Sequence, residues 1–195
     1  MKTVTIKLYE FTELTETSKQ TALNNYRNTI SEIFWADEIV DSVKALFEAC
    51  NGIELIDYSL GERGSYVKIR FFEDAEELTG KRAIAWIENN LLSNLRIPYS
   101  KHNGERQRMA QYRAYYRPGM IKPCPFTGCC YDEDILGQLR ADIKNGESLY
   151  YAFKNIADTA QRLISEEAEN QSSDEYIEEF FQSNEYMFTA NGKVW

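Results

Sequence analysis

Residues 53–72 read IELIDYSLGERGSYVKIRFF, and this stretch decides the fold class. Apolar and polar side chains alternate on both sides of a polar segment, Gly61-Glu62-Arg63-Gly64. A period of two is typical of half-buried strands, and glycine reaches the positive φ angles that tight turns require. The stretch therefore predicts a β-hairpin with strands at 53–60 and 65–72.

Helical patterns lie on both sides of this hairpin, with apolar side chains three and four positions apart. The expected helices span residues 16–30, 36–50, 81–97, 132–143 and 147–163, and a last one begins after Ser172. The helix at 36–50 has the most complete apolar stripe, and the following Asn51-Gly52 is a typical helix end.

Both ends of the chain return to extended patterns. Residues 1–11 alternate polar and apolar side chains, and Asn191-Gly192 predicts a tight hairpin near residue 195. We expect this hairpin to pair with the N-terminal strand, and the N-terminal strand to share one sheet with residues 53–72. The predicted fold class is α+β, a single domain with a mainly antiparallel sheet and a helical cluster.

Charge divides the chain into three parts that are expected to pack as one domain. Residues 1–98, the α/β part, hold 11 Lys and Arg against 16 Asp and Glu. Residues 99–131 form a loop-rich connection with prolines and glycines, in which residues 99–122 hold 6 basic and 1 acidic side chain. Residues 132–195, the helical part with the C-terminal hairpin, are strongly acidic, and the whole chain has a net charge of −9.

Composition limits the class of protein. A hydrophobic fraction of 43% and an aromatic fraction of 13% are typical of a packed globular protein. The sequence has neither a long apolar run nor a leader-like N-terminus, so we expect a soluble cytoplasmic protein without membrane attachment. Four cysteines are too few for a disulfide scaffold, which favours free thiols or metal ligands.

No catalytic motif is present. The sequence lacks a phosphate-binding GxxxxGK[ST] loop, a GxGxxG fingerprint, an HExxH zinc-protease motif and an EF-hand loop. The single histidine, His102, could be the base of a serine-type catalytic triad, but the sequence has no recognisable nucleophile elbow that carries the serine. The protein is therefore expected not to be an enzyme.

The cysteine cluster Cys124-Pro-Phe-Thr-Gly-Cys129-Cys130 is the candidate metal site. Three thiols within seven residues, with a proline and a glycine between them, can converge on one ion. We expect Cys124 and Cys129, with Cys130 or His102, to hold a structural zinc ion. Tetrahedral zinc needs four ligands, so a fourth must come from a distant position, where His102 is the only histidine and Cys50 the only other cysteine. The alternatives are small buried cysteines without a ligand and, less favoured, a reactive thiol.

A basic segment follows the helix that ends near Pro98. It interleaves arginines and tyrosines, and its candidate binding residues are Arg113, Tyr115, Tyr116 and Arg117. Arginine binds phosphates and tyrosine stacks on bases, but both are also the residues most enriched in protein interfaces. Nucleic-acid binding, protein binding and a merely solvated basic face therefore remain open for this segment.

An acidic segment is the second candidate for partner binding. Glu166, Glu167 and Glu169 lie on a predicted helix, where they can present negative charge to a basic partner. Solvated carboxylates without a partner are the alternative.

Three stretches carry a resemblance to known proteins. They are LYEFTELTETSKQTALNNYR at 8–27, PFTGCCYDEDIL at 125–136 and DEYIEEFFQSNEYMFTANGKVW at 174–195. They resemble small acidic proteins of bacteriophages and other mobile elements, a group largely of unknown function. Small phage proteins of this kind include anti-CRISPR inhibitors, which have no enzymatic activity and block Cas9 by occupying its guide or DNA surfaces. The resemblance implies a cytoplasmic setting in a host cell and assigns no role to a residue.

The expected function is therefore a non-catalytic inhibitor that binds a host nucleic-acid-processing effector such as Cas9. The acidic segment and the Arg/Tyr segment are its expected contact surfaces. The first rival is a nucleic-acid-binding accessory protein that uses the basic segment. The second is a small thiol or metal enzyme centred on Cys124 to Cys130.

Overall fold

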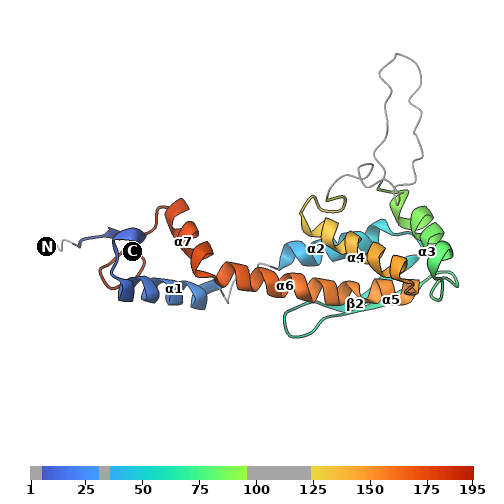
Figure 1. Ribbon diagram of the computed structural model, residues 1–195, viewed down its shortest axis with the longest axis horizontal. Coiled ribbons are helices and arrows are strands. Elements are labelled where there is room, and N and C mark those ends of the chain that lie inside the picture. Colours follow the sequence, from blue (N-terminus) through green and yellow to red (C-terminus); the bar gives the residue numbers. More distant parts are fainter. Residues whose placement is uncertain (1–5, 31–35, 96–123) are drawn as a thin grey trace, which may run out of the picture. The chain divides into compact units, whose positions relative to one another are not determined.

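Helices and short antiparallel strands make up the part of the chain that the computed structural model describes, residues 6–30, 36–95 and 124–195 (Figure 1). In chain order the elements are β1 (Tyr9–Glu10), the 3-10 turn η1 (Phe11–Glu13), α1 (Glu16–Ile30), α2 (Asp37–Ala49), β2 (Ile53–Ser59), β3 (Tyr66–Phe71), α3 (Gly80–Ile87), the π-helical turn η2 (Glu88–Leu92), α4 (Tyr131–Asn145), α5 (Leu149–Lys154), α6 (Ile156–Ser172), α7 (Asp174–Ser183) and β4 (Met187–Phe188). The α+β fold class is confirmed.

The chain divides into two compact units. We call residues 36–165 the central unit, and residues 1–35 together with 166–195 the terminal unit. The boundary falls within α6, because its residues from Glu166 onward belong to the terminal unit. Each unit has its own strands and its own buried side chains, so each is described separately.

The hairpin predicted for residues 53–72 is confirmed in the central unit. Strands β2 and β3 pair antiparallel, from Ile53 opposite Phe71 to Ser59 opposite Tyr66. Side chains on β3 alternate between buried and exposed, with Val67 and Phe71 buried. This alternation places one face of the hairpin on the core, as the period of two in the sequence predicts.

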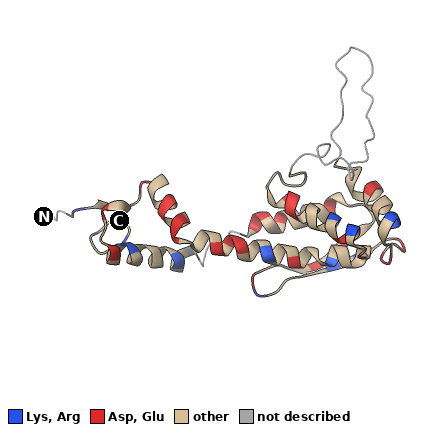
Figure 2. Cartoon of the chain, viewed as in Figure 1, with Lys and Arg blue, Asp and Glu red and all other residues tan. Residues whose placement is uncertain are grey.

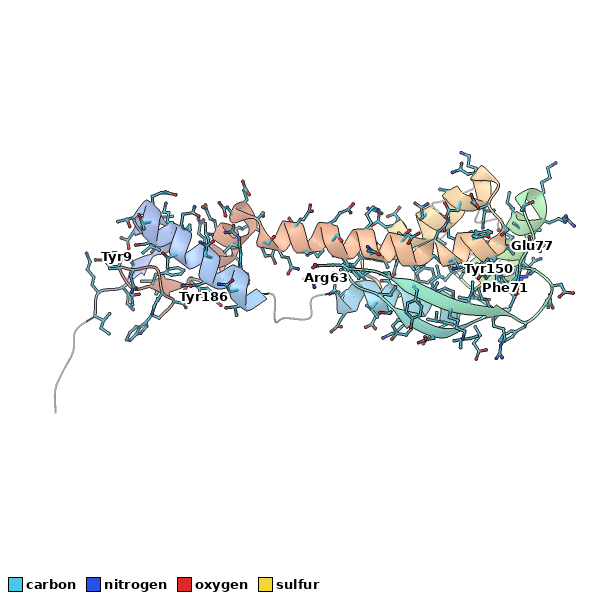
Figure 3. All side chains as sticks on the ribbon, turned by 90° about the horizontal axis from the view of Figure 1, so that it is seen from below. Tyr9, Arg63, Phe71, Glu77, Tyr150 and Tyr186 are labelled. Carbon is cyan, nitrogen blue, oxygen red and sulfur yellow. The ribbon has the colours of Figure 1, made fainter. Side chains whose placement is uncertain are left out.

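The core of the central unit forms between α2, α4 and the hairpin. The predicted stripe of α2 is confirmed, because Ile39, Val43, Leu46 and Phe47 are buried and Val40 is half-buried. Gly52 follows the helix at a φ of 90°. Phe153 of α5 lies at the centre of an aromatic group, with ring centroids 5.8 Å from Phe47 and 6.1 Å from Phe71. Figure 3 labels Phe71, the last residue of β3, and Tyr150 of α5.

Two helical expectations in the central unit are wrong in detail. The helix expected from 147 is two helices, because Ser148 caps α5 and Asn155 separates α5 from α6. The Asn155 amide donates to the buried Asp142 of α4 at 3.1 Å, which fixes the junction. The helix beginning at Gly80 changes at Glu88 to the wider turns of η2.

The terminal unit joins segments from both ends of the sequence. As predicted, the C-terminal hairpin pairs with the N-terminal strand: Tyr9 lies opposite Phe188 and Glu10 opposite Met187. A third extended segment follows, because Phe188 bridges to Val194. The N-terminal strand itself is only two residues long in the described chain, and residues 1–5 of the expected strand lie outside the described residues.

The expectation of one sheet shared by the N-terminal strand and residues 53–72 is wrong. Strand β1 pairs with β4, and β2 pairs with β3, in two separate two-stranded sheets of the described chain. Period two predicts that a segment is a strand but carries no information about its partner. The aromatic side chains of the C-terminal hairpin select β1 as that partner through the core they share.

One capping prediction is displaced by a single residue. Ser173, and not Ser172, caps α7, because its hydroxyl accepts the backbone N–H of Tyr176 at 3.2 Å. Ser172 is the last residue of α6. In the described residues no helix is long and apolar enough to cross a membrane.

Candidate functional site

Aromatic rings form the core of the terminal unit. Phe181 of α7 is 1% exposed and packs against five other rings. Among them, the centroids of Phe11, Phe188 and Tyr186 lie 5.4, 5.0 and 5.5 Å away. Leu23 of α1 belongs to the same buried cluster. Such ring pairs add about 0.5–1.5 kcal/mol each beyond the area that they bury. Phe181 therefore holds the two ends of the chain together.

Arg27 fixes α1 against the start of α7. Its Nε donates to the backbone oxygen of Ser172 at 2.8 Å, and another guanidinium nitrogen pairs with Asp174. Tyr26, one residue earlier, packs its ring 5.0 Å from that of Phe180. These contacts set the direction of α7 and hence the position of its C-terminal end.

The C-terminal end of α7 closes in an uncommon way. The N–H of Glu185 donates to the oxygen of Gln182 at 3.2 Å, and the N–H of Tyr186 donates to the oxygen of Phe181 at 3.0 Å. This pair of bonds is the Schellman ending, whose left-handed residue is usually glycine. Here that residue is Glu185, with a φ of 54°. A side chain in this region costs about 1–2 kcal/mol.

A cleft opens at this helix end. It has a volume of about 490 Å³, and two carboxylates, those of Glu10 and Glu185, contribute to its lining. The other lining residues are Phe11, Thr12, Phe181, Gln182, Tyr186 and Met187. The volume lies in the usual range for ligand pockets. Tyr186 and Tyr9 are labelled in Figure 3 within this unit.

The electrostatics of the cleft favour a cation. The backbone carbonyls at the C-terminal end of α7 carry the negative pole of the helix dipole, and Glu185 follows them directly. Across the described residues, the terminal unit holds four Lys and Arg against eleven Asp and Glu. Figure 2 colours the Asp and Glu positions of α7 red. A positively charged group is therefore attracted to this unit and to the cleft in particular.

The acidic residues predicted to bind a partner lie in the same unit. Glu166, Glu167 and Glu169 occupy the second half of α6, and Glu166 and Glu169 are exposed. The Glu167 carboxylate accepts the Gln171 amide at 2.6 Å. Their role in binding stays a prediction. Arg113, Tyr115, Tyr116 and Arg117 lie outside the described residues, as does His102.

In the central unit, a carboxylate organises the cysteine segment. Asp132 is fully buried, and its Oδ2 accepts the backbone N–H groups of Phe126, Thr127 and Gly128 at 2.8, 2.8 and 3.1 Å. The Thr127 hydroxyl donates to Oδ1 at 2.9 Å. The carboxylate thus orders the irregular backbone of residues 126–128. The cysteine pattern predicts that a zinc ion orders this segment.

The ionisation of Asp132 follows from these contacts. Burial raises the pKa of this carboxyl, but hydrogen bonds from Ser42 and from the backbone of Gly128, Phe126 and Thr127 outweigh the burial and lower the pKa below its ordinary value. The side chain is therefore charged at neutral pH and holds the turn as a carboxylate.

Two thiols of this segment, those of Cys124 and Cys129, are poor nucleophiles. Burial, the hydrogen bond to Glu38 and nearby charge raise the pKa of Cys129 to about 11, and the Cys129 sulfur lies 3.2 Å from Glu38 Oε2. Burial and the charge of Asp132 also raise the pKa of Cys124. Burial raises the pKa of Cys50 to about 12. A catalytic thiol needs the opposite shift, so these groups do not favour a thiol enzyme.

The zinc site remains a prediction. Within residues 6–30, 36–95 and 124–195, no three His, Cys, Asp or Glu side chains are grouped so that they could hold a metal ion. The cysteines at 124, 129 and 130 are free in the structure. A site that includes His102 falls partly outside the described residues.

Sequence reasoning missed the two features that the structure makes most evident. It assigned Asp132 only to an acidic first turn, although a carboxylate placed four to six residues after Phe126, Thr127 and Gly128 can close back on their amides. It also missed Glu185. The signal was the absence of glycine after α7, where the sequence Ser183-Asn184-Glu185 ends the helix.

Comparisons with known proteins add no identification. Protein-family models, curated proteins and solved structures all give no match to this chain.

Proposed function

We propose that the protein is a non-catalytic binding protein whose terminal unit captures a basic segment of a partner protein. The partner that fits the sequence resemblance is a nucleic-acid-processing effector such as Cas9, which the protein would inhibit in the host cytoplasm. Such effectors hold nucleic acid in positively charged channels. An acidic protein that occupies such a channel competes with the phosphate backbone.

The cleft at the end of α7 is the observation that carries this proposal. Its two carboxylates and the helix carbonyls attract a Lys or Arg side chain, and the aromatic residues among its lining supply apolar contact. Glu185 supports the same interpretation. A residue kept in a strained backbone conformation is a reason to suspect function, because glycine would fold more easily there.

The acidic face of the unit has a separate role in the proposal. Exposed charges such as Glu166 and Glu169 act mainly on the association rate, whereas groups in a desolvated cleft act mainly on dissociation. Charge reversal at Glu166, Glu167 and Glu169 should therefore slow association. The Arg/Tyr segment remains a predicted second contact, and Tyr115→Ala or Arg117→Ala should speed dissociation.

The experiment compares two variants with the same charge change. Glu10→Gln/Glu185→Gln removes both cleft carboxylates, while Glu73→Gln/Glu76→Gln removes two exposed carboxylates of the central unit. Binding to purified Cas9 is measured by interferometry at physiological salt, together with DNA cleavage. We expect about a tenfold or greater loss of affinity, about 1.4 kcal/mol, only in the cleft variant.

Two results would count against the proposal. Equal affinities of the cleft and control variants would show that only net charge matters. If the wild-type protein neither binds Cas9 nor reduces its cleavage at several-fold excess, Cas9 is the wrong target, and other basic host nucleases must be tested. DNA or RNA affinity of the protein alone that falls steeply with salt would instead favour the nucleic-acid-binding rival.

A further inference from the structure

The small sheet of the terminal unit has one buried and one exposed face. Phe188 of β4 points to the core and is fully buried, whereas its neighbour Met187 is 36% exposed. Successive residues of a strand point to opposite faces. The exposed face therefore holds Met187 together with the residues that lie directly opposite it on each side.

These neighbours are Glu10 and Trp195. Glu10 pairs with Met187 in the register of β1 and β4. On the other side, the N–H of Trp195 donates to the oxygen of Met187 at 2.9 Å, one position beyond the bridge between Phe188 and Val194. Glu10, Met187 and Trp195 thus form one row across three extended segments. Trp195 is 67% exposed.

This row extends the cleft. Glu10 and Met187 both line the cleft, so Trp195 stands next to its Met187 side. Neighbouring strands lie about 4.8 Å apart, so a side chain about 10 Å from Glu10 across the sheet belongs to the same binding surface. The row thus offers an indole face for stacking, a thioether for apolar contact and a carboxylate as a hydrogen-bond acceptor. A planar cation can use all three.

We infer that the cleft and this row recognise arginine, in preference to lysine, in an extended segment of the partner protein; this inference rests on the proposed function. A guanidinium is planar, stacks on an indole face and can make two parallel hydrogen bonds to one carboxylate. An ammonium group is compact and strongly hydrated and gains less from stacking. Trp195 supplies the stacking face and Met187 the apolar contact beside it. Glu10 supplies an acceptor through the carboxylate that also takes part in the capping box of η1 with Glu13.

Three lysines of the terminal unit oppose a cation here. Lys19 Nζ lies 5.6 Å from the centre of the cleft-lining Phe11 ring, and Lys7 Nζ lies 4.8 Å from that of Tyr9, the residue before Glu10. Lys193 lies two residues before Trp195 and so on the same face of its segment. The two cleft carboxylates, Glu10 and Glu185, must therefore outweigh the repulsion from these lysines.

The test uses three capped pentapeptides that differ only in the central residue: Gly-Ser-Arg-Ser-Gly, its lysine analogue and its neutral citrulline analogue. Each is titrated into the 195-residue chain, and binding is followed by NMR shifts of the Trp195 indole N–H and the amides of residues 185–187. We expect the arginine peptide to bind at least threefold more tightly than the lysine peptide. Trp195→Ala should abolish this preference, and Trp195→Phe should keep part of it.

The outcomes separate the two proposals. If the lysine peptide binds as tightly as the arginine peptide, and Glu10→Gln weakens both, the arginine inference is overturned and the acidic cleft stands. If citrulline binds like arginine, charge is irrelevant and both proposals fail. If the arginine peptide gives no shift at about 10 mM, the inference is overturned, and the Cas9 comparison decides the proposed function alone. The amide spectrum of Trp195→Ala, compared with that of Trp195→Phe, controls for folding.

Discussion

The central and terminal units are built from different kinds of contact. The central unit uses contiguous sequence, residues 36–165, and buries aliphatic stripes of α2 and α4 around Phe153. The terminal unit joins two distant segments through a small group of aromatic rings. The charge also differs in density: 55 described residues of the terminal unit hold four Lys and Arg against eleven Asp and Glu, whereas 102 in the central unit hold 10 against 18.

This difference suggests that the two units have different roles, one in stability and the other in binding. A contiguous unit with many aliphatic contacts is suited to stability. A unit held by a few rings, with concentrated negative charge and a strained residue at its cleft, is suited to binding. The two units should therefore respond differently to matched substitutions.

The largest expected effect is at the centre of the aromatic cluster. Phe181→Ala should lower the free energy of unfolding by about 3–5 kcal/mol, because it removes a fully buried ring and leaves a cavity. Hydrogen exchange should rise in α1 and α7 more than in α2 and α4. Phe180→Ala, at a half-buried neighbouring ring, is the control and should cost less. Equal exchange in both units would contradict the separate cores.

The next effect is on the buried carboxylate of the central unit. Asp132→Asn should cost about 2 kcal/mol at pH 7, since hydrogen bonds to a charged group contribute about 1.5–3 kcal/mol. The folded-state pKa is lowered, so the stabilisation is present above the unfolded pKa of about 3.9 and is lost as the pH falls through the folded pKa. The difference between wild type and variant in urea unfolding should therefore shrink toward pH 3. A difference that is constant from pH 7 to pH 3 would show that Asp132 does not act as a carboxylate.

A smaller effect on stability is expected when alanine replaces either of two glycines, and its sign should differ between them. A Cβ at Gly192 would lie 2.1 Å from the backbone oxygen of Ser18, and its φ is 79°. Gly192→Ala should therefore destabilise the terminal unit by about 1–3 kcal/mol. Gly137 lies on an exposed face of α4, and a methyl group added there would meet nothing within 4 Å, so Gly137→Ala should stabilise by about 0.5–1 kcal/mol. Thermal unfolding of both variants checks this, and a stabilising Gly192→Ala would refute the close packing of the C-terminal hairpin on α1.

The smallest expected effect is a change in the zinc content of the protein when a cysteine of the central unit is replaced. The sequence prediction expects about one zinc per chain, measured by elemental analysis of protein purified without added metal. Because zinc binds thiolates and the pKa of Cys129 is raised to about 11, affinity should increase as the pH rises. Cys129→Ser should reduce the zinc content, with Cys50→Ser as the control. Occupancy below a few tenths of an equivalent would remove the zinc hypothesis.

The sequence predicted elements well where the pattern is local. The hairpin of residues 53–72, the α2 stripe with Gly52 and the pairing of the chain ends were all accessible from spacing and turn residues. The sheet partner of β1 was not, because alternation does not specify a neighbour. The junction at Asn155 depends on the distant Asp142, which periodicity does not show.

The candidate site was predictable only in its charge. An acidic surface in the C-terminal part of the chain follows from composition, but the cleft depends on the register that sets Glu10 beside Met187 and on the helix ending at Glu185. Cys129 and Asp132 show the same limit. Their roles are decided by Glu38 and Ser42 of α2, about ninety residues earlier in the chain.

Glu185→Gly tests the central claim most directly, because the Glu185 side chain is assigned to binding and not to stability. Glycine relieves the left-handed strain at a φ of 54°, so the free energy of unfolding should stay the same or rise by up to about 1 kcal/mol. Affinity for a basic partner, measured on the same protein sample with Cas9 or the arginine peptide, should fall at least threefold. A variant that is more stable and binds as tightly as wild type would contradict the assignment of Glu185 to binding.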